Sequence, residues 1–94
     1  MVTAFVLINA RRDMIPETAE ALDRMAGVSE VYSIAGTYDL IAVIRVQSNE
    51  KLAELVTGSM LKMGGIERSE TLIALKTYSK HDLERMFSIG LDSE

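Results

Sequence analysis

The sequence lacks cysteine and tryptophan, and its 94 residues include one histidine and one proline. Without cysteine, the chain can form no disulfide, no thiolate nucleophile and no thiolate metal site. The histidine, His81, stands between Lys80 and Asp82 in a polar segment, with no second candidate ligand at metal-binding spacing. We therefore expect His81 to be a solvated surface residue, and we expect neither a metal nor a cofactor.

Long apolar runs and basic clusters are also missing. No stretch approaches the roughly 20 apolar residues of a membrane span, and Arg11 and Arg12 follow the first apolar run instead of preceding it, unlike a signal peptide. The 10 basic and 14 acidic residues give a net charge of −4. Nucleic-acid binders gather basic residues on one face, whereas here they are scattered. We expect a cytoplasmic protein with no membrane and no direct nucleic-acid partner.

Apolar residues make up 48% of the chain, and their spacing predicts six main elements. Two helices are expected, one with Pro16 in its first turn and Gly27 at its C′ position, and one capped by Ser48 or Asn49 and ending near Lys62. Their predicted inner stripes are Ile15, Ala19, Leu22 and Met25, and Leu52, Leu55, Val56, Ser59 and Met63. Four strands are expected, over residues 3–10, 28–35, 40–46 and 71–78.

The order of these elements is βαβ followed by βαβ. A weak repeat supports the division, because Met25–Val28 resembles Met63–Ile66. Right-handed crossovers in two such halves predict an α+β, ferredoxin-like βαββαβ sandwich with antiparallel sheet order 4-1-3-2 and both helices on one face. We expect this domain to span residues 1–79, with a C-terminal helix and tail over residues 80–94, the helix at 82–87.

The predicted sheet has one face that no helix covers. Alternation along the strands places Phe5, Leu7, Ile41 and Val43, or their neighbours, on that face. An apolar patch of this size marks an interface. The sequence therefore predicts a two-fold dimer in which one sheet faces the other.

The connector Gly36-Thr37-Tyr38-Asp39 between two apolar runs permits two interpretations. It is the turn of an antiparallel hairpin, in which Gly36 supplies a positive φ and Asp39 hydrogen-bonds the turn. It also contains what an amino-acid site needs, since a glycine lets a ligand approach backbone N–H groups, an aspartate binds an ammonium and a tyrosine forms an aromatic wall.

Two stretches resemble the effector-binding, or RAM, domain of the Lrp/AsnC family of transcriptional regulators. They are LDRMAGVSEVYSIAGTYDLIAVIRV, with its Gly-x-Tyr-Asp element, and GGIERSETLIALKTYSK, with Thr71 before an aliphatic strand that ends in Lys76. The resemblance covers about residues 3–80. It implies a non-enzymatic module whose dimers pack sheet to sheet and assemble further, into rings of four or five dimers.

The resemblance also implies a site. Small effectors, typically amino acids, would bind between dimers at Gly36, Thr37, Tyr38 and Asp39, with Asp39 as the partner of the amine. Ser69 and Thr71, at the start of the expected fourth strand, would complete the pocket from a neighbouring subunit. Because the first strand begins at Thr3, we expect no helix-turn-helix domain ahead of it. The chain would then act by assembling with full-length Lrp/AsnC-type regulators of transcription, or by contacting some other protein.

Two other functions remain open. The same dimer architecture occurs in small α/β-barrel enzymes of the monooxygenase or isomerase type, which place His, Asn, Trp or Tyr inside the cavity between sheet and helices. The absence of tryptophan and the position of His81 outside that cavity disfavour this alternative. A structural partner subunit that binds no ligand is the third possibility.

Overall fold

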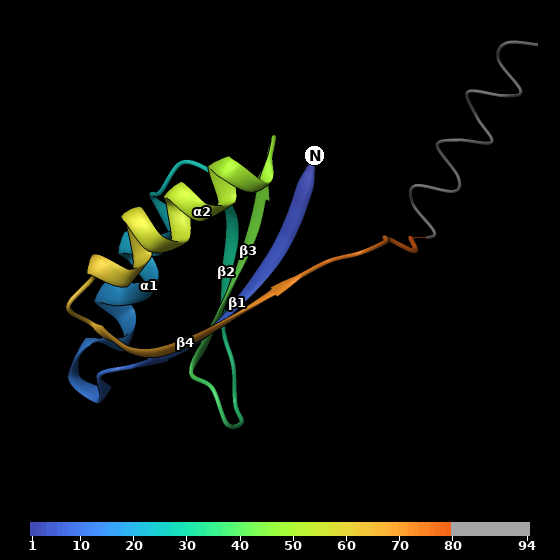
Figure 1. The fold of residues 1–94 in the computed structure, drawn as a ribbon. Helices are drawn as coiled ribbons and strands as arrows, with labels where there is room; N and C mark the ends of the chain where they lie inside the picture. Colours follow the sequence, from blue (N-terminus) through green and yellow to red (C-terminus); the bar gives the residue numbers. More distant parts are fainter. Residues whose placement is uncertain (80–94) are drawn as a thin grey trace, which may run out of the picture.

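The computed structural model describes residues 1–79. Its elements follow in the order β1 (Val2–Ala10), η1 (Arg12–Met14), α1 (Ile15–Asp23), β2 (Val28–Ser33), β3 (Leu40–Val46), α2 (Asn49–Gly58), η2 (Met60–Lys62) and β4 (Ile66–Ile73). The strands form one antiparallel sheet in the order β2-β3-β1-β4, with both helices on the same side (Figure 1). The ferredoxin-like βαββαβ fold is therefore confirmed. The helix expected at 82–87, the tail and His81 lie outside the described residues.

The core lies between the helices and one face of the sheet. On β1, Ala4, Val6 and Ile8 are at most 1% exposed. Because directly paired residues of antiparallel strands point to the same side, the partners of Val6 and Ala4 on β3, Ala42 and Ile44, join the same core. The helices cover this face with the predicted apolar stripes, of which Leu22, Leu52 and Leu55 are buried.

The first helix begins as predicted and ends earlier. Pro16 lies in its first turn, where its missing N–H costs nothing. The α-helix ends at Asp23, so Gly27 does not occupy the C′ position, and that prediction was wrong. Gly27 instead has a φ of +96° in a turn closed by the Val28 N–H and the Met25 carbonyl oxygen, 3.1 Å apart. A Cβ at Gly27 would lie 2.9 Å from Cγ1 of Val46, so close packing as well as backbone conformation requires glycine.

The second helix is capped by Ser48, whose Oγ accepts a hydrogen bond from the Lys51 N–H at 3.2 Å. Regular α-helix ends at Gly58, and the turn η2 continues to Lys62. Met60, on η2, is 1% exposed and belongs to the core.

Thr18 is a buried polar residue that the apolar pattern did not predict. It lies on α1, is 2% exposed, and its hydroxyl has no hydrogen-bond partner among the described residues. Gly65, just before β4, packs against it so closely that a Cβ there would collide with the Thr18 hydroxyl. The small pair lets the start of β4 approach α1.

The fourth strand lies five residues earlier than the predicted range 71–78, so that prediction was wrong. Its position is set by β1, because the two strands are antiparallel and Ala4 pairs with Ile73. The last ladder hydrogen bond joins the Ala74 N–H to the Thr3 carbonyl oxygen at 2.9 Å, where β1 begins. The strand begins with the mostly polar stretch IERSE, as an edge strand can, and this stretch gave a weaker signal than the apolar run after it.

The opposite face of the sheet is open, and we call it the open face. It is defined by Phe5, Leu7, Ile41, Val43 and Leu72 at its centre, which the pairing of β1 with β3 and β4 places on one side. At its β2 margin, the Tyr32 hydroxyl donates to Oε2 of Glu30 at 2.7 Å, and Glu30 forms an ion pair with Arg45 at 3.5 Å. The predicted assignment of Phe5, Leu7, Ile41 and Val43 to this face is confirmed.

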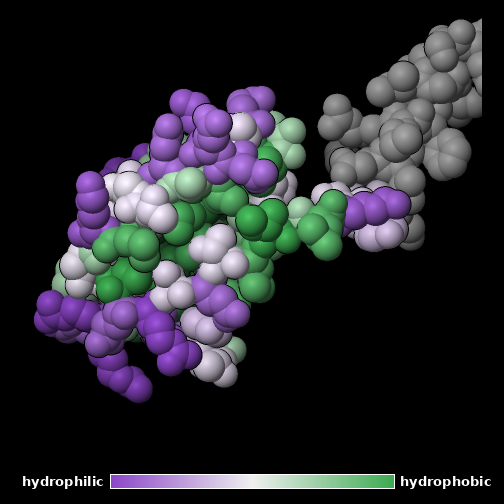
Figure 2. Space-filling model, viewed as in Figure 1, coloured by the Kyte–Doolittle hydropathy of each residue, from purple (hydrophilic) through white to green (hydrophobic). Residues whose placement is uncertain are grey.

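After β4 the chain leaves the body of the domain. Residues 74–79, which we call the arm, run outward in Figure 1 without a helix or strand assignment. Figure 2 shows apolar surface that continues from the body onto the beginning of this segment. The arm therefore presents apolar side chains that the domain itself does not cover.

Candidate functional site

The Gly36–Asp39 loop joins β2 to β3 and is closed by backbone hydrogen bonds. The Ile34 N–H donates to the Asp39 carbonyl oxygen, and the Asp39 N–H donates to the Ile8 carbonyl oxygen, both at 2.9 Å. Gly36 has a φ of +152°, and a Cβ there would meet no atom within 4 Å. The backbone conformation, and no neighbouring atom, therefore favours glycine at this position.

The Asp39 side chain extends the pairing of β1 with β3 by one hydrogen bond. Its Oδ2 accepts from the Ala10 N–H at 2.9 Å, just beyond the last backbone pair, Ile8 with Leu40. A carboxylate here replaces the carbonyl that β3 no longer supplies. The other oxygen, Oδ1, has no hydrogen-bond partner among residues 1–79, so it is able to accept one from a ligand.

Two further side chains fix the loop from β1 and β4. Nδ2 of Asn9 donates to the Thr37 carbonyl oxygen at 2.9 Å. The Tyr38 hydroxyl donates to Oε2 of Glu70 at 2.8 Å, and the Arg68 guanidinium carbon lies 6.0 Å from the centre of the Tyr38 ring. These contacts hold the loop against the β4 side of the open face.

This arrangement brings carboxylates, a guanidinium and an aromatic ring to one corner of the sheet. Carboxylates such as those of Asp39 and Glu70 bind an ammonium group through charge-assisted hydrogen bonds. The planar guanidinium of Arg68 binds a carboxylate with two parallel hydrogen bonds. These are the kinds of group that a small zwitterion requires, carboxylates for its ammonium and a guanidinium for its carboxylate.

Ser69 and Thr71 lie on the other side of the sheet within one chain. They pair with Ile8 and Val6, whose side chains face the helices, whereas Glu70 pairs with Leu7 on the open face. Ser69 is half-buried and Thr71 is exposed at the edge of the sheet. One subunit therefore does not bring these two residues to the loop, and their contribution from a neighbouring subunit stays a prediction.

Sequence reasoning missed Asn9, Arg68 and Glu70 as partners of the loop. Beyond an irregularity at its start, β4 alternates regularly from Arg68 to Ile73, which separates Arg68 and Glu70 from Ser69 and Thr71. That alternation was visible in the sequence. Because the fourth strand was expected to start at Thr71, Arg68 and Glu70 were not assigned to a strand.

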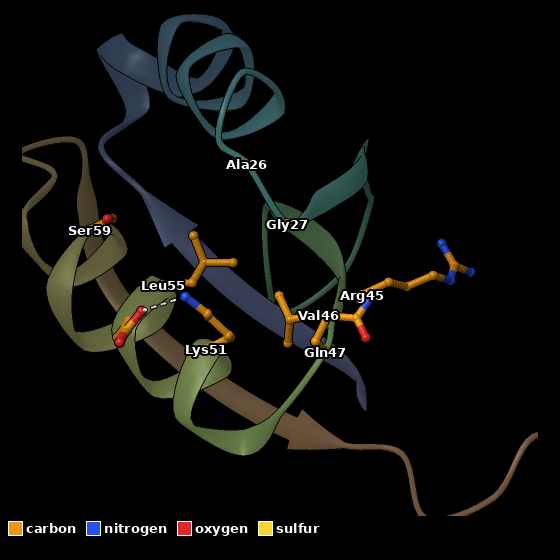
Figure 3. Close-up of a pocket in the computed structure, with 9 residues that line it drawn as sticks. Ala26, Gly27, Arg45, Val46, Gln47, Lys51, Leu55 and Ser59 are labelled. Atoms are coloured by element: carbon orange, nitrogen blue, oxygen red, sulfur yellow. Dashed lines mark ion pairs between the residues drawn. The ribbon is translucent and has the colours of Figure 1, made fainter. Parts of the chain in front are cut away.

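A separate pocket of about 400 Å³ opens between α2, the end of β3 and the turn before β2 (Figure 3). In Figure 3 the side chain of Leu55 points from α2 toward the end of β3, the Lys51 ammonium is joined to a carboxylate of its own helix, and Arg45 points away from the helix. Lys51 Nζ and Glu54 Oε2 form an exposed ion pair at 3.8 Å. Its nine lining residues are Ala26, Gly27, Arg45, Val46, Gln47, Lys51, Glu54, Leu55 and Ser59, and none is of the types that the enzyme alternative requires.

Within residues 1–79, no helix is both long enough and apolar enough to cross a membrane. The same residues contain no group of three or more His, Cys, Asp or Glu side chains placed to bind a metal ion.

Comparisons with known proteins agree on one family. A family model described as the Lrp/AsnC ligand binding domain matches residues 3–83. The HTH-type transcriptional regulator FL11 of Pyrococcus abyssi is 34% identical over 79 residues, which are 82% of this chain and 50% of the relative. This chain thus spans about half the length of that regulator.

Solved structures show the same fold. TTHA0845 from Thermus thermophilus is 42% identical with a TM-score of 0.80, and the match covers 85% of this chain and 100% of that one. The transcriptional regulator NMB0573 from Neisseria meningitidis, solved as a complex with L-Met, has a TM-score of 0.76 at 16% identity, and the match covers 83% of this chain and 52% of that one. At that identity the second likeness concerns the fold alone.

Proposed function

This chain belongs to the Lrp/AsnC ligand-binding domain family, and from that premise we propose that it senses an amino acid, which binds at the Gly36–Asp39 loop where copies of the chain meet. The family is one of regulators, so the proposed role is regulation without catalysis. The proposal names a ligand class, a site and an assembly, and each can be tested separately.

The observation that carries the proposal is the state of Asp39. One carboxylate oxygen is engaged by the Ala10 N–H, and the other has no partner among residues 1–79. A half-used carboxylate at the end of a strand can bind an ammonium group without giving up its structural hydrogen bond. Arg68, within cation–π range of Tyr38, supplies the positive charge for the carboxylate of the same ligand.

A related fold supports the choice of ligand class. The regulator NMB0573 was solved in complex with L-Met, an amino acid, and its domain matches this fold. The likeness does not extend to individual residues, so the side-chain preference of this chain is left to experiment.

The proposed assembly has two levels. The open face forms a homodimer by packing against a second sheet, and four or five dimers associate so that Ser69 and Thr71 of a neighbour approach the loop. A ligand shifts an equilibrium only by its differential affinity for the two states. A pocket completed by a second dimer has that difference built in, because a separate dimer lacks half of the site.

The proposed output is transcriptional. The curated relatives include HTH-type regulators about twice the length of the aligned segment. The chain would assemble with such full-length regulators and change their activity when the amino acid binds. Copurification of this chain with a tagged full-length relative, with and without amino acid, measures this step.

The decisive experiment is a thermal-shift screen with the twenty common amino acids, followed by calorimetric titration of those that bind. A ligand at about 100 times its dissociation constant stabilises the folded state by roughly 2.7 kcal/mol. For a domain of this size we expect Tm to rise by roughly 10 °C or more.

Two variants of Asp39 separate charge from structure. Asp39→Asn keeps an oxygen that accepts from the Ala10 N–H and removes the negative charge, so we expect a folded protein that no longer responds to the amino acid. Asp39→Ala also leaves the Ala10 N–H unpaired, at a cost of about 1–3 kcal/mol in the free energy of unfolding. An undiminished response of Asp39→Asn would exclude Asp39 as the amine partner, and a parent that binds none of the twenty would remove the sensor proposal.

A further inference from the structure

We infer that the site at the Gly36–Asp39 loop prefers a basic amino acid, one that carries a second cation at the end of a long side chain. Asp39 holds its α-ammonium, Arg68 its α-carboxylate and Glu70 the distal cation. The inference rests on the proposed amino-acid site and adds to it the class of side chain that this site selects.

The corner of the sheet beside the loop carries more negative than positive charge. The Asp39 and Glu70 carboxylates stand against the Arg68 guanidinium, which leaves an excess of one negative charge. Arg11, which follows β1, is already paired with an aspartate at 3.3 Å, and Arg12 lies on η1, beyond the strand. A ligand with one surplus positive charge balances the corner, whereas a neutral amino acid leaves one carboxylate without a cation.

Each of the three charged groups has capacity left for a ligand. Asp39 uses one oxygen for a backbone N–H, and Glu70 uses Oε2 for the Tyr38 hydroxyl. The Arg68 guanidinium forms no hydrogen bond or ion pair within residues 1–79 and instead contacts the Tyr38 ring at 6.0 Å. An unpaired guanidinium beside two half-used carboxylates can take the carboxylate of a ligand while they take its cations.

The register of the strands orders these groups along β1. Asp39 binds the N–H of Ala10, Arg68 pairs with the residue before Ala10, and Glu70 pairs two residues further back. At about 3.3 Å per residue, Glu70 is anchored roughly 7 Å from Arg68 and roughly 10 Å from Asp39 along the strand. The α-ammonium and α-carboxylate share one carbon and match the neighbouring pair, and a cation on a four-carbon stem reaches the distant carboxylate.

Tyr38 spans the stretch between the two ends of this arrangement. Its backbone belongs to the loop beside Asp39, and its hydroxyl donates to Glu70 at 2.8 Å, so its ring occupies the space between them. The aliphatic stem of a basic amino acid packs on apolar surface while its charged end stays with polar groups. The Tyr38 ring supplies that surface and leads the stem to the carboxylate.

Water at the site determines how strongly charge discriminates. In a single subunit Arg68 and Glu70 are exposed, and exposed charge pairs contribute little. In the proposed assembly a neighbour with the uncharged Ser69 and Thr71 approaches the loop, and the exclusion of water strengthens the attraction between the distal cation and Glu70. An acidic amino acid places a like charge against the same carboxylate and is rejected.

The experiment is a calorimetric titration of the full chain with lysine, norleucine and glutamate at low ionic strength, where charge effects are largest. Norleucine has the aliphatic chain of lysine without the distal ammonium. We expect lysine to bind about tenfold more tightly than norleucine, and glutamate to bind most weakly. Glu70→Gln should remove the advantage of lysine and leave norleucine unchanged. The matched control, Glu54→Gln, makes the same charge change at a 70% exposed carboxylate on α2 and should leave the order unaltered.

A charge reversal tests the same assignment through a gain of binding. Glu70→Lys should invert the order, so that glutamate binds more tightly than lysine, and circular dichroism checks that each variant is folded. If norleucine binds the parent as tightly as lysine, or Glu70→Gln weakens both alike, the preference is wrong and the amino-acid site stands. If the parent binds none of the amino acids, the proposed function fails and the preference fails with it.

Discussion

The two faces of the sheet carry similar apolar residues, but the helices of the same chain cover only one of them. On the helix side, Ile8, Leu40 and Ile44 are 0% exposed. On the open face, Phe5 is 38% exposed and Leu72 45%, and ionised side chains stand at the margins. One face is completed by the chain's own helices and stabilises the subunit, whereas the other is the face that we propose for assembly. The comparison separates residues that decide folding from residues that decide association.

The largest effect should come from the helix side. Ile44→Ala removes three carbon atoms from a fully buried position, and we expect the free energy of unfolding to fall by about 2–5 kcal/mol. Ile44→Val, the matched control, should cost about 0.5–1.5 kcal/mol. Urea denaturation at fixed low protein concentration measures both. A loss below about 1 kcal/mol for Ile44→Ala would break the comparison, because this face would then not be a packed core.

A smaller effect of a different kind is expected on the open face. Phe5→Asn removes an aromatic side chain that is 38% exposed in one subunit and should weaken the dimer by about 2–3 kcal/mol. The subunit should stay folded, as judged by circular dichroism in dilute solution, while sedimentation equilibrium reports dissociation. A variant with the parent's mass at every concentration would show that this face is not where copies meet.

The smallest effect concerns the charged margin of the open face. The hydrogen bond from the Tyr32 hydroxyl to Glu30, followed by repulsion from the Glu30 charge, raises the pKa of Tyr32 above its ordinary value. Because the folded state favours the protonated phenol, this contribution to stability is complete below the ordinary pKa, about 10, and is lost as pH rises through the raised pKa.

The measurement is an ultraviolet titration of tyrosine ionisation. We expect Glu30→Gln to lower the pH at which Tyr32 ionises, with Tyr32→Phe identifying its signal among the three tyrosines. If Tyr32 ionises at the same pH in Glu30→Gln as in the parent, Glu30 is not the cause of the raised pKa.

The elements of the sheet centre could be predicted because each is apolar with a clear period. Alternation along Thr3–Ala10 placed Phe5 and Leu7 together on the open face, as the structure shows. The edge strand β4 was misplaced because its start is polar and its position depends on where β1 begins, a tertiary constraint. The burial of Thr18 was not predicted for a similar reason, since it involves a contact with Gly65, which is distant in the sequence.

The candidate site could be predicted only in part. Gly36-Thr37-Tyr38-Asp39 is contiguous in sequence, so its composition alone drew attention to it. Its partners are distant along the chain, as Tyr38 and Glu70 are 32 residues apart. No local pattern links such residues, and their proximity follows only from the order of the strands. The double use of Asp39, by the backbone of Ala10 and by a proposed ligand, also became apparent only from the geometry.

The way the Gly36–Asp39 loop is tied down has a consequence for affinity. The loop is held by hydrogen bonds to Ile8, Asn9, Ala10 and Glu70 and by its own closure from Ile34 to Asp39. Ordering a flexible loop consumes part of the free energy that a small molecule gains on binding. Here hydrogen bonds already hold the loop, so the proposed amino acid would spend little of its binding free energy on ordering it, and discrimination among amino acids would fall to the groups around the loop.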